Sequence, residues 1–237
     1  MFVTIKRKTI IIALVIILAV VGIIVGTVLG VRAAREANAN YNGKTVVIDA
    51  GHGGFDGGVV GVNTGVKESD INLAISQQLQ TILQNRGYRV VMTRTTQDGL
   101  YGRTAQNRKM ADMRVRERII NDASPDVVVS IHQNSFPSPN VRGPQVFFSN
   151  QCESSPEFAS IMQEVLNYTL ESDRLSKRGD FFILECSPYP SILIESGFLS
   201  NPEDEALLVT QDHQNKIATA IANGIHLFLF NEPPVLV

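Results

Sequence analysis

Four side chains that can bind a metal or move a proton stand at the ends of apolar runs or before a helical segment. His52 follows Val-Val-Ile-Asp-Ala-Gly and precedes two further glycines. His132 ends a second apolar run, Glu195 ends a third, and Glu68 stands in a polar stretch that opens a segment of helical period. Open α/β sheets gather their chemistry at the carboxyl ends of strands, so we expect these four residues to meet there.

Two histidines and one carboxylate form a ligand set typical of catalytic zinc, which keeps a fourth position for water and lowers the pKa of that water toward about 7. We assign His52, Glu68 and His132 as ligands of one Zn²⁺ per chain. A second carboxylate can take the proton of the water and pass it to a leaving amine, and we assign this role to Glu195. One strand-end histidine is usually structural, but four such residues together favour catalysis, because unpartnered buried charge is costly.

Apolar runs of strand length alternate with helical segments from Thr45 onward, which predicts one α/β domain with a mainly parallel, twisted six-stranded sheet and helices on both faces. Glycines beside His52 allow a sharp turn at the end of the first strand. The expected strands are 45–50, 89–93, 126–132, 145–149, 181–184 and 191–195. The expected helices run from Glu68 to the Arg86-Gly87 pair and over about 109–122, 156–170 and 211–230.

The N-terminal part is a separate region. Residues 9–31 are 23 residues without a charge, preceded by three basic residues. About 20 helical residues cross a bilayer, whereas the apolar region of a signal peptide has about 7 to 15, so we expect a transmembrane anchor. The basic residues before it favour a cytoplasmic segment 1–8 and an extracytoplasmic catalytic domain at 43–230. We expect a tether at 32–42 between the anchor and this domain, and a tail at 231–237. A signal-peptidase site at Ala37-Asn-Ala is the alternative.

The charge argues against a nucleic-acid-binding protein, and the cysteine content argues against a disulfide-rich or Cys-x-x-Cys protein. Beyond the tether, 16 basic residues face 22 acidic ones. Nucleic-acid binding calls for a concentrated basic surface, so we expect no nucleic-acid partner. Cys152 and Cys186 are the two cysteines and show no Cys-x-x-Cys spacing. We expect two buried thiols, with a disulfide as the alternative.

Four motif blocks resemble those of the zinc-dependent N-acetylmuramoyl-L-alanine amidases (amidase type 3) over about residues 44–230. These blocks are Asp49-Ala-Gly-His-Gly-Gly, the Glu68 turn before Asn72-Leu-Ala, Ser130-Ile-His-Gln-Asn, and Leu193-Ile-Glu-Ser-Gly-Phe-Leu-Ser-Asn. The resemblance implies cleavage of the amide between N-acetylmuramic acid and L-alanine in peptidoglycan. It implies zinc on the two histidines and the first glutamate, catalysis by the late glutamate, and a supporting or substrate-binding role for Asn134.

Within the family, residues 94–118 and the plan of an anchor plus a catalytic domain most resemble the amidases of the spore cortex. That resemblance implies removal of stem peptides for muramic-lactam formation, in the cell wall or the intermembrane space of the forespore. Division amidases carry a long inserted helix that blocks the site, but here only a few polar residues follow Ser149. We therefore expect control by expression, location or a partner such as an activator protein.

Two other interpretations remain open. One is a membrane-anchored protein that binds peptidoglycan without turnover, and the other is a zinc peptidase that cuts within the stem peptide. The complete set of three ligands and a base argues against the first, since a binding protein has no chemical need for Glu195.

Overall fold

The computed structural model describes residues 16–27, 41–102 and 104–232. By its contacts the chain divides into two compact units, Met1–Asn42 and Gly43–Val237. In the first unit, residues 16–27 form a helix with exposed apolar side chains. No helix within the described ranges is long and apolar enough to cross a membrane. Half of the expected anchor at 9–31 and nearly all of the tether lie outside these ranges, so the anchor stays a prediction.

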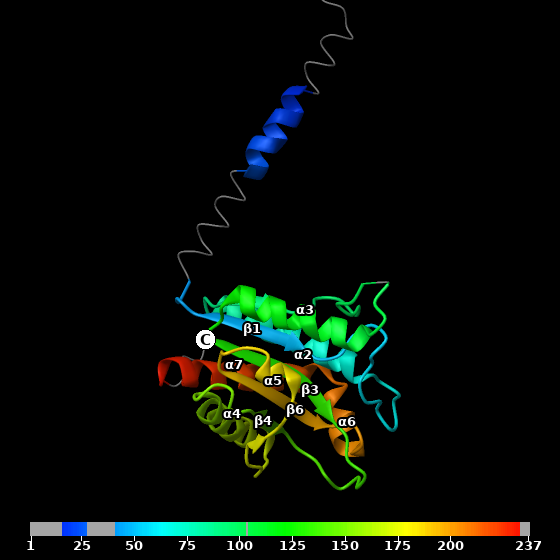
Figure 1. Cartoon of the computed structure of the whole chain (residues 1–237). Coiled ribbons are helices and arrows are strands. Elements are labelled where there is room, and N and C mark those ends of the chain that lie inside the picture. Colours follow the sequence, from blue (N-terminus) through cyan, green and yellow to red (C-terminus); the bar gives the residue numbers. More distant parts are fainter. Residues whose placement is uncertain (1–15, 28–40, 103, 233–237) are drawn as a thin grey trace, which may run out of the picture. The chain divides into compact units, whose positions relative to one another are not determined.

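A six-stranded sheet with the order β2-β1-β3-β6-β4-β5 forms the centre of the second unit (Figure 1). Strands β2, β1, β3 and β6 run parallel, β4 is antiparallel to β6, and β5 is parallel to β4. The strands are β1 (Thr45–Ala50), β2 (Arg89–Met92), β3 (Val127–Asn134), β4 (Gln145–Phe148), β5 (Lys177–Arg178) and β6 (Ser191–Phe198). The predicted α/β class and mainly parallel sheet are thus confirmed.

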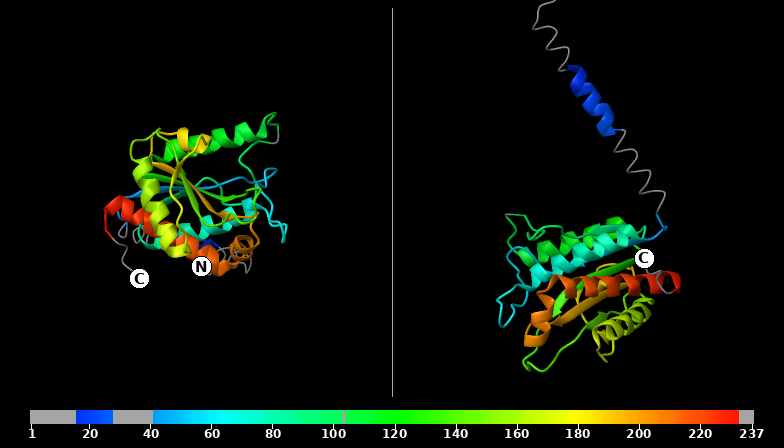
Figure 2. Two further views of the ribbon diagram at one scale, coloured as in Figure 1. Left: turned by 90° about the horizontal axis from the view of Figure 1, so that it is seen from below. Right: turned by 180° about the vertical axis from the view of Figure 1, so that it is seen from behind.

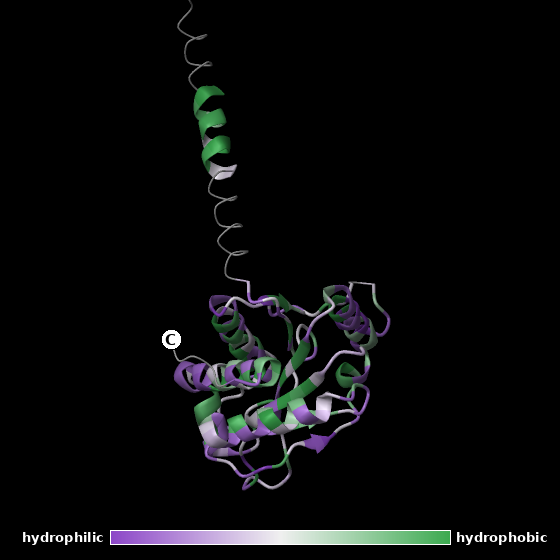
Figure 3. Ribbon diagram, turned by 90° about the vertical axis from the view of Figure 1, so that its left-hand side faces the viewer, coloured by the Kyte–Doolittle hydropathy of each residue, from purple (hydrophilic) through white to green (hydrophobic). Residues whose placement is uncertain are grey.

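Helices cover both faces of the sheet (Figure 2). One face packs against α2 (Glu68–Asn85), α4 (Ser155–Leu170) and α7 (Gln211–Phe230), and the other packs against α3 (Arg108–Ala123) and α5 (Phe182–Glu185). Side chains alternate between the two clusters along each strand, because successive residues of a strand point to opposite faces. In β1, for example, Val46 and Ile48 join the first cluster and Val47 joins the second. The central strands are accordingly rich in hydrophobic residues (Figure 3).

A short helix that the sequence analysis missed, α6 (Pro202–Leu208), holds a loop near the carboxyl end of β1. The Asn201 side chain caps α6 by accepting from the backbone N–H groups of Glu203 and Asp204. The Glu205 carboxylate accepts from the backbone of Asn63 and from the backbone and hydroxyl of Thr64 at 2.7–3.0 Å. These contacts fix the loop that leads into α2.

The predicted strand at 181–184 is wrong, because Phe182–Glu185 form the helix α5 and Phe181 precedes it. Ile183 and Leu184 are neighbours in the sequence, yet both are buried in the same cluster on one face of the sheet. A strand would turn consecutive side chains to opposite faces, whereas one helical turn places both on the sheet. The edge of the sheet is formed instead by the polar pair Lys177–Arg178 of β5.

Two strands extend beyond their predicted ends. β3 continues past His132 to Asn134, and β6 continues past Glu195 to Phe198. The pairing of these strands shifts register between His132 and Asn134. His132 and Glu195 therefore lie within ordered strands and not in the loops that follow them.

A substitution at Leu79 of α2 tests how this helix packs on the sheet, because the Leu79 side chain is fully buried. Leu79→Ala should lower the free energy of unfolding by about 2–5 kcal/mol, the usual cost of a cavity in a packed core. Urea unfolding followed by circular dichroism measures this loss. Leu175→Ala, at a side chain that is 79% exposed, is the control and should change stability by less than about 0.5 kcal/mol. Equal effects of the two changes would contradict the described core.

Candidate metal centre and active site

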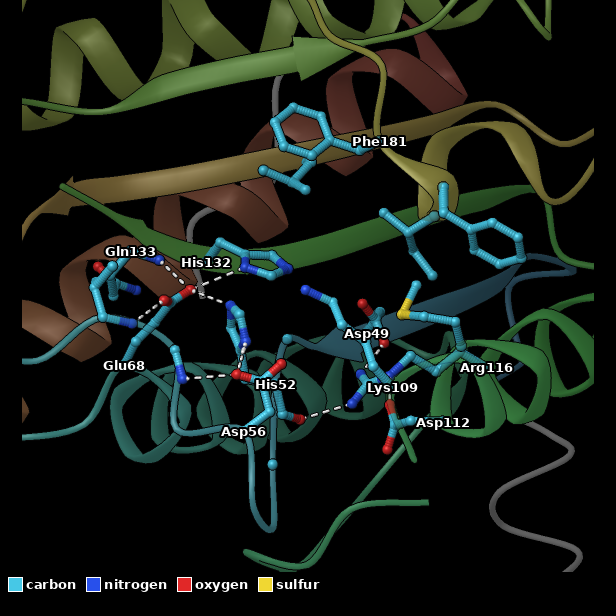
Figure 4. A pocket seen from close by; sticks show the side chains of 18 of the residues that line it. Asp49, His52, Asp56, Glu68, Lys109, Asp112, Arg116, His132, Gln133 and Phe181 are labelled. Carbon is cyan, nitrogen blue, oxygen red and sulfur yellow. Dashed lines mark hydrogen bonds and ion pairs between the residues drawn. The ribbon is translucent and has the colours of Figure 1, made fainter. Parts of the chain in front are cut away.

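The structure brings His52, Glu68 and His132 together from three elements (Figure 4). His52 follows β1, Glu68 is the first residue of α2, and His132 lies in β3. Glu68 Oε1 is 3.2 Å from His52 Nε2 and 2.9 Å from His132 Nδ1. The ligand atoms that the three residues offer lie within 4.8 Å of one another, so they could hold one metal ion.

His52 occupies the left-handed region of backbone conformation, with φ of 62°. A non-glycine residue there is uncommon and carries strain, so the surrounding structure must hold it. The sequence analysis placed the turn in the glycines, and Gly53 and Gly54 also have positive φ, but the turn begins at the histidine itself. This conformation turns the imidazole toward Glu68 and His132 (Figure 4).

Two glycines are needed because other side chains approach their backbone. A Cβ added at Gly51 would collide with the imidazole ring of His132. A Cβ added at Gly58, where φ is 68°, would collide with the Glu68 carboxylate. The loop after β1 therefore stays free of side chains at the two positions where the candidate ligands pack against it.

The Glu68 carboxylate is held by donors on both of its oxygens. Oε2 accepts from the backbone N–H of Val59 at 2.9 Å. Oε1 accepts from the backbone N–H of Gln133 at 3.1 Å and from the Asn72 amide at 3.2 Å. Burial acts to raise the pKa of Glu68, but the hydrogen bonds and charges of His132 and His52 outweigh it and hold this pKa well below its usual range. Glu68 is therefore a fixed anion at neutral pH.

Asp56 orients His52 from the other side of the ring. His52 Nδ1 lies 3.0 Å from Asp56 Oδ1, and Asp56 Oδ1 also accepts from the backbone N–H of Gly58. Burial acts to lower the pKa of His52, but Glu68 and Asp56 together raise it to about 9. With Nδ1 bonded to Asp56, Nε2, which faces Glu68, is the atom that would bind a metal, as in the usual carboxylate–histidine–metal arrangement. The donor set and its supports thus fit zinc.

Glu195 lies on β6 directly beside His132 of β3, its partner in the strand pairing, and pairs on its other side with Gln145 of β4. Its Oε2 is buried and makes no hydrogen bond with any described residue. Burial and the nearby Glu68 raise the pKa of Glu195 to about 7, although His132 and His52 act in the opposite direction. A carboxyl group poised near neutrality can both accept and release a proton.

Two buried arginines hold the turn at His52 through hydrogen bonds to its backbone carbonyls. Arg116 of α3 donates to the backbone carbonyls of Ala50 at 2.8 Å and His52 at 2.6 Å. Arg94, which follows β2, donates to the carbonyls of Ala50 at 2.8 Å and Gly51 at 2.9 Å. Three consecutive carbonyls are therefore held by guanidinium groups, which explains how the strained turn persists.

The charge of Arg116 is balanced by two carboxylates. Its guanidinium donates to Asp49 at 2.5 Å and to Asp112 at 2.6 Å. Asp49 also accepts from the hydroxyls of Thr93 at 2.7 Å and Ser130 at 2.6 Å. Burial acts to raise the pKa of Asp49, but Arg116 and the two hydroxyls lower it to about 2. The pair therefore joins α3 to strands β1 and β3 beneath the metal centre.

The four candidate residues line a cavity of about 600 Å³. Asn134 also lines it, and its side chain accepts from the backbone N–H of Ser135, so the structure places this residue at the site without giving it a distinct contact with the metal ligands.

The segment between β4 and α4, residues 149–154, contains no helix, as expected from the few polar residues that follow Ser149. Cys152 and Cys186 are both free thiols and not a disulfide, but each is only partly buried and not buried as expected.

Comparison with known proteins places the chain in a family. The family described as N-acetylmuramoyl-L-alanine amidase matches residues 46–226. The germination-specific N-acetylmuramoyl-L-alanine amidase of Bacillus subtilis is 34% identical over 189 residues, which cover 78% of this chain and 79% of that protein. The amidase AmiA of Escherichia coli is 30% identical over 230 residues, which cover 77% and 75% of the two chains.

Solved structures of amidases resemble this chain as well. The CwlD amidase of Clostridioides difficile, determined in complex with the GerS lipoprotein, superposes with a TM-score of 0.76 at 33% identity and covers 80% of this chain and 100% of that one. The catalytic domain of the amidase CwlV from Bacillus (Paenibacillus) polymyxa superposes with a TM-score of 0.70 at 32% identity, over 78% and 98%. The chain belongs to the N-acetylmuramoyl-L-alanine amidase family, and it is a hydrolase of peptidoglycan.

The sequence analysis identified the candidate ligands and the candidate base but missed the residues that support them. Asp56 lies four residues after His52, in a glycine-rich loop where its contact with the ring was not evident. Asp49 could have been recognised as a supporting residue, because it is a charged residue in a run of buried strand residues and so needs a partner. Nothing in the sequence marks Arg94 and Arg116 as supporting residues, because their contacts with the loop at 50–52 join residues far apart in sequence.

Removing the carboxylate that orients His52 should weaken metal binding. Asp56→Asn should lower the affinity for Zn²⁺ about 10- to 100-fold, because partners of this kind fix the orientation and basicity of a metal-binding histidine. Competition with a chromophoric chelator measures the affinity. Asp98→Asn, at an exposed carboxylate, is the matched control and should leave the affinity unchanged. Unchanged affinity in Asp56→Asn would remove Asp56 from the metal centre.

The buried pair of Asp49 and Arg116 should make stability depend on pH in the acid range. The pKa of Asp49 is lowered in the fold, so its contribution is complete above its unfolded pKa of about 3.9 and is lost as pH falls through about 2. Asp49→Asn should lower the free energy of unfolding by about 3–5 kcal/mol at pH 7. The difference from the wild type should shrink between pH 4 and pH 2.

Urea titrations at several pH values measure this difference, and Asp180→Asn, at an exposed position, is the control. A difference between wild type and Asp49→Asn that stays constant from pH 7 to pH 2 would contradict the assigned ionisation of Asp49.

Proposed function

We propose that this amidase depends on zinc held by His52, Glu68 and His132, and that Glu195 is its catalytic base. The observation that carries this proposal is the placement of Glu195, which pairs with the candidate ligand His132 on the neighbouring strand and whose Oε2 is buried without a hydrogen bond to any described residue. Its pKa is raised to about 7, whereas that of Glu68 is lowered. Two carboxylates with opposite shifts in one site support two different roles, a ligand and a proton carrier.

A bound zinc ion supplies Lewis-acid polarisation of the scissile carbonyl and lowers the pKa of water. Asp56 and the donors around Glu68 orient the ligand atoms before any metal arrives, so little reorganisation is needed. Glu195 takes a proton from the attacking water and delivers it to the amide nitrogen, which then leaves as the amine of L-alanine. Asn134 lines the same cavity, and we assign it a supporting role in substrate binding.

We place the catalytic domain, residues 43–230, outside the cytoplasm on a membrane anchor formed by residues 9–31. The uncharged 23-residue length of that segment and the basic residues before it support this placement. The similarity to a germination-specific amidase and to CwlD supports action on the spore cortex. The CwlD structure contains the GerS lipoprotein, so a lipoprotein partner is proposed for this chain as well.

Two alternatives make different predictions. A peptidoglycan-binding protein without turnover would need no carboxyl group with a raised pKa beside its metal ligands, and Glu195 has one. A zinc peptidase would use the same residues but cleave another bond, so product analysis separates it from the amidase. The family match favours the amidase.

The cleaved bond can be identified directly. The zinc-loaded chain incubated with defined muropeptides should release muramic acid without peptide and intact peptides that begin with L-alanine. Mass spectrometry of both products checks this expectation. Peptides that are shortened at an internal bond would establish a peptidase, and the absence of any product with the proposed lipoprotein partner present would support the binding protein.

Variants should separate metal binding from proton transfer. Glu195→Gln should keep one zinc per chain and lose about 10²- to 10⁴-fold in kcat, because it removes the base and leaves the ligands in place. His52→Ala should lose the zinc itself. Metal content by mass spectrometry and turnover of muropeptides measure the two effects. Wild-type turnover by Glu195→Gln would remove Glu195 from the mechanism.

A further inference from the structure

The cavity at the metal centre extends to one side, between α3 and α5. This side lobe is lined by Lys109 and Met113 of α3, by Phe181, Phe182 and Ile183 at α5, and by Leu193 of β6. Ile183 and Leu193 are almost fully buried beneath it. Asp49, Asp112 and Arg116 line the cavity on this side as well, but they are paired with one another, so the side lobe combines apolar side chains of α5 and β6 with one unpaired cation, Lys109, among the described residues.

The charged groups that line the cavity are nearly all paired within the protein. Arg116 is paired with Asp49 and Asp112. Asp56 is paired with His52, and Glu68 is shared by His52 and His132. Among the described residues that line the cavity, only Glu195, which we have assigned as the base, and the Lys109 ammonium stand outside these pairs.

Lys109 is exposed and forms no ion pair with any residue in the described part of the chain. It is near enough to Asp56 to help lower the pKa of that carboxyl group, but His52 and the backbone of Gly58 are the groups that bond to Asp56. The Lys109 side chain lies in the cavity on the same side of the two histidines as Asp49 and Arg116 (Figure 4). Its ammonium is therefore available to an anion that enters with the substrate.

We propose that the side lobe is the subsite for the stem peptide and that Lys109 binds a carboxylate of that peptide. This proposal rests on the proposed function, because the scissile bond must lie at the metal centre. The lactyl carboxyl group of the glycan is consumed in the scissile amide, so a free carboxylate close to that bond belongs to the peptide. The apolar wall of Met113, Phe182 and Ile183 suits the aliphatic part of a peptide better than the hydroxyl-rich surface of a sugar.

Two matched substrates test the subsite with the full-length, zinc-loaded chain in detergent. They are muropeptides whose second stem residue is either D-glutamate, with a free carboxylate, or D-isoglutamine, in which an amide replaces that carboxylate. A charge-assisted contact should give the wild type about a tenfold higher kcat/KM on the carboxylate substrate. Lys109→Ala should lower kcat/KM on that substrate about tenfold, mainly through KM, and change it less than about twofold on the amide.

The control variants separate a direct contact at Lys109 from a general loss of positive charge. Arg118→Ala removes a cation from the exposed side of the same helix, outside the cavity, and should keep the wild-type preference. Lys109→Glu should reverse the preference, and all variants should retain zinc. Equal losses on both substrates, or an unchanged preference in Lys109→Ala, would overturn the subsite while leaving the amidase intact. Failure of the wild type to cleave either substrate, with the proposed lipoprotein partner added, would overturn the proposed function and the subsite with it.

Discussion

The buried ion pair between Arg116 and Asp49 is the interaction on which the site depends. It joins α3 to β1, and through Ser130 and Thr93 it reaches β3 and the residue after β2. The same guanidinium donates to the carbonyl of His52, whose left-handed backbone carries strain. Buried ion pairs seldom add much net stability, because desolvation offsets their attraction. Here the pair fixes the direction of a backbone turn, and the geometry of the candidate ligands follows from it.

The two central carboxylates show how environment separates chemical roles within one cavity. Glu68 is surrounded by donors from Val59, Asn72 and Gln133, which stabilise its charged form. Glu195 lies on the strand next to that of His132 and has a buried oxygen without a donor among the described residues, so burial favours its neutral form. The difference arises from backbone placement, because Glu68 begins a helix after a loop and Glu195 lies inside a strand.

Sequence reasoning recovered the features that depend on local pattern. Alternating apolar runs and helical periods predicted the α/β class, and the residue types at strand ends and at one helix start predicted four candidate residues that line one cavity in the structure. It failed where distant contacts decide the outcome. The run at 181–184 has the composition of a strand, but packing on the face of the sheet makes it a helix. Asp56, Arg94 and Arg116 act through contacts that only the folded chain creates.

The position of Glu195 between two paired strands has a consequence for motion. Its backbone is bonded to β3 on one side and to β4 on the other, so this residue can rearrange only by rotating its side chain. His52, in contrast, lies in a loop whose order depends on side-chain contacts with Arg116 and Asp56. Local opening of the site should therefore begin at the loop that carries His52, while the strand that carries Glu195 stays folded. If the proposed roles hold, an amidase built in this way can lose and regain its metal without disturbing the proposed base Glu195.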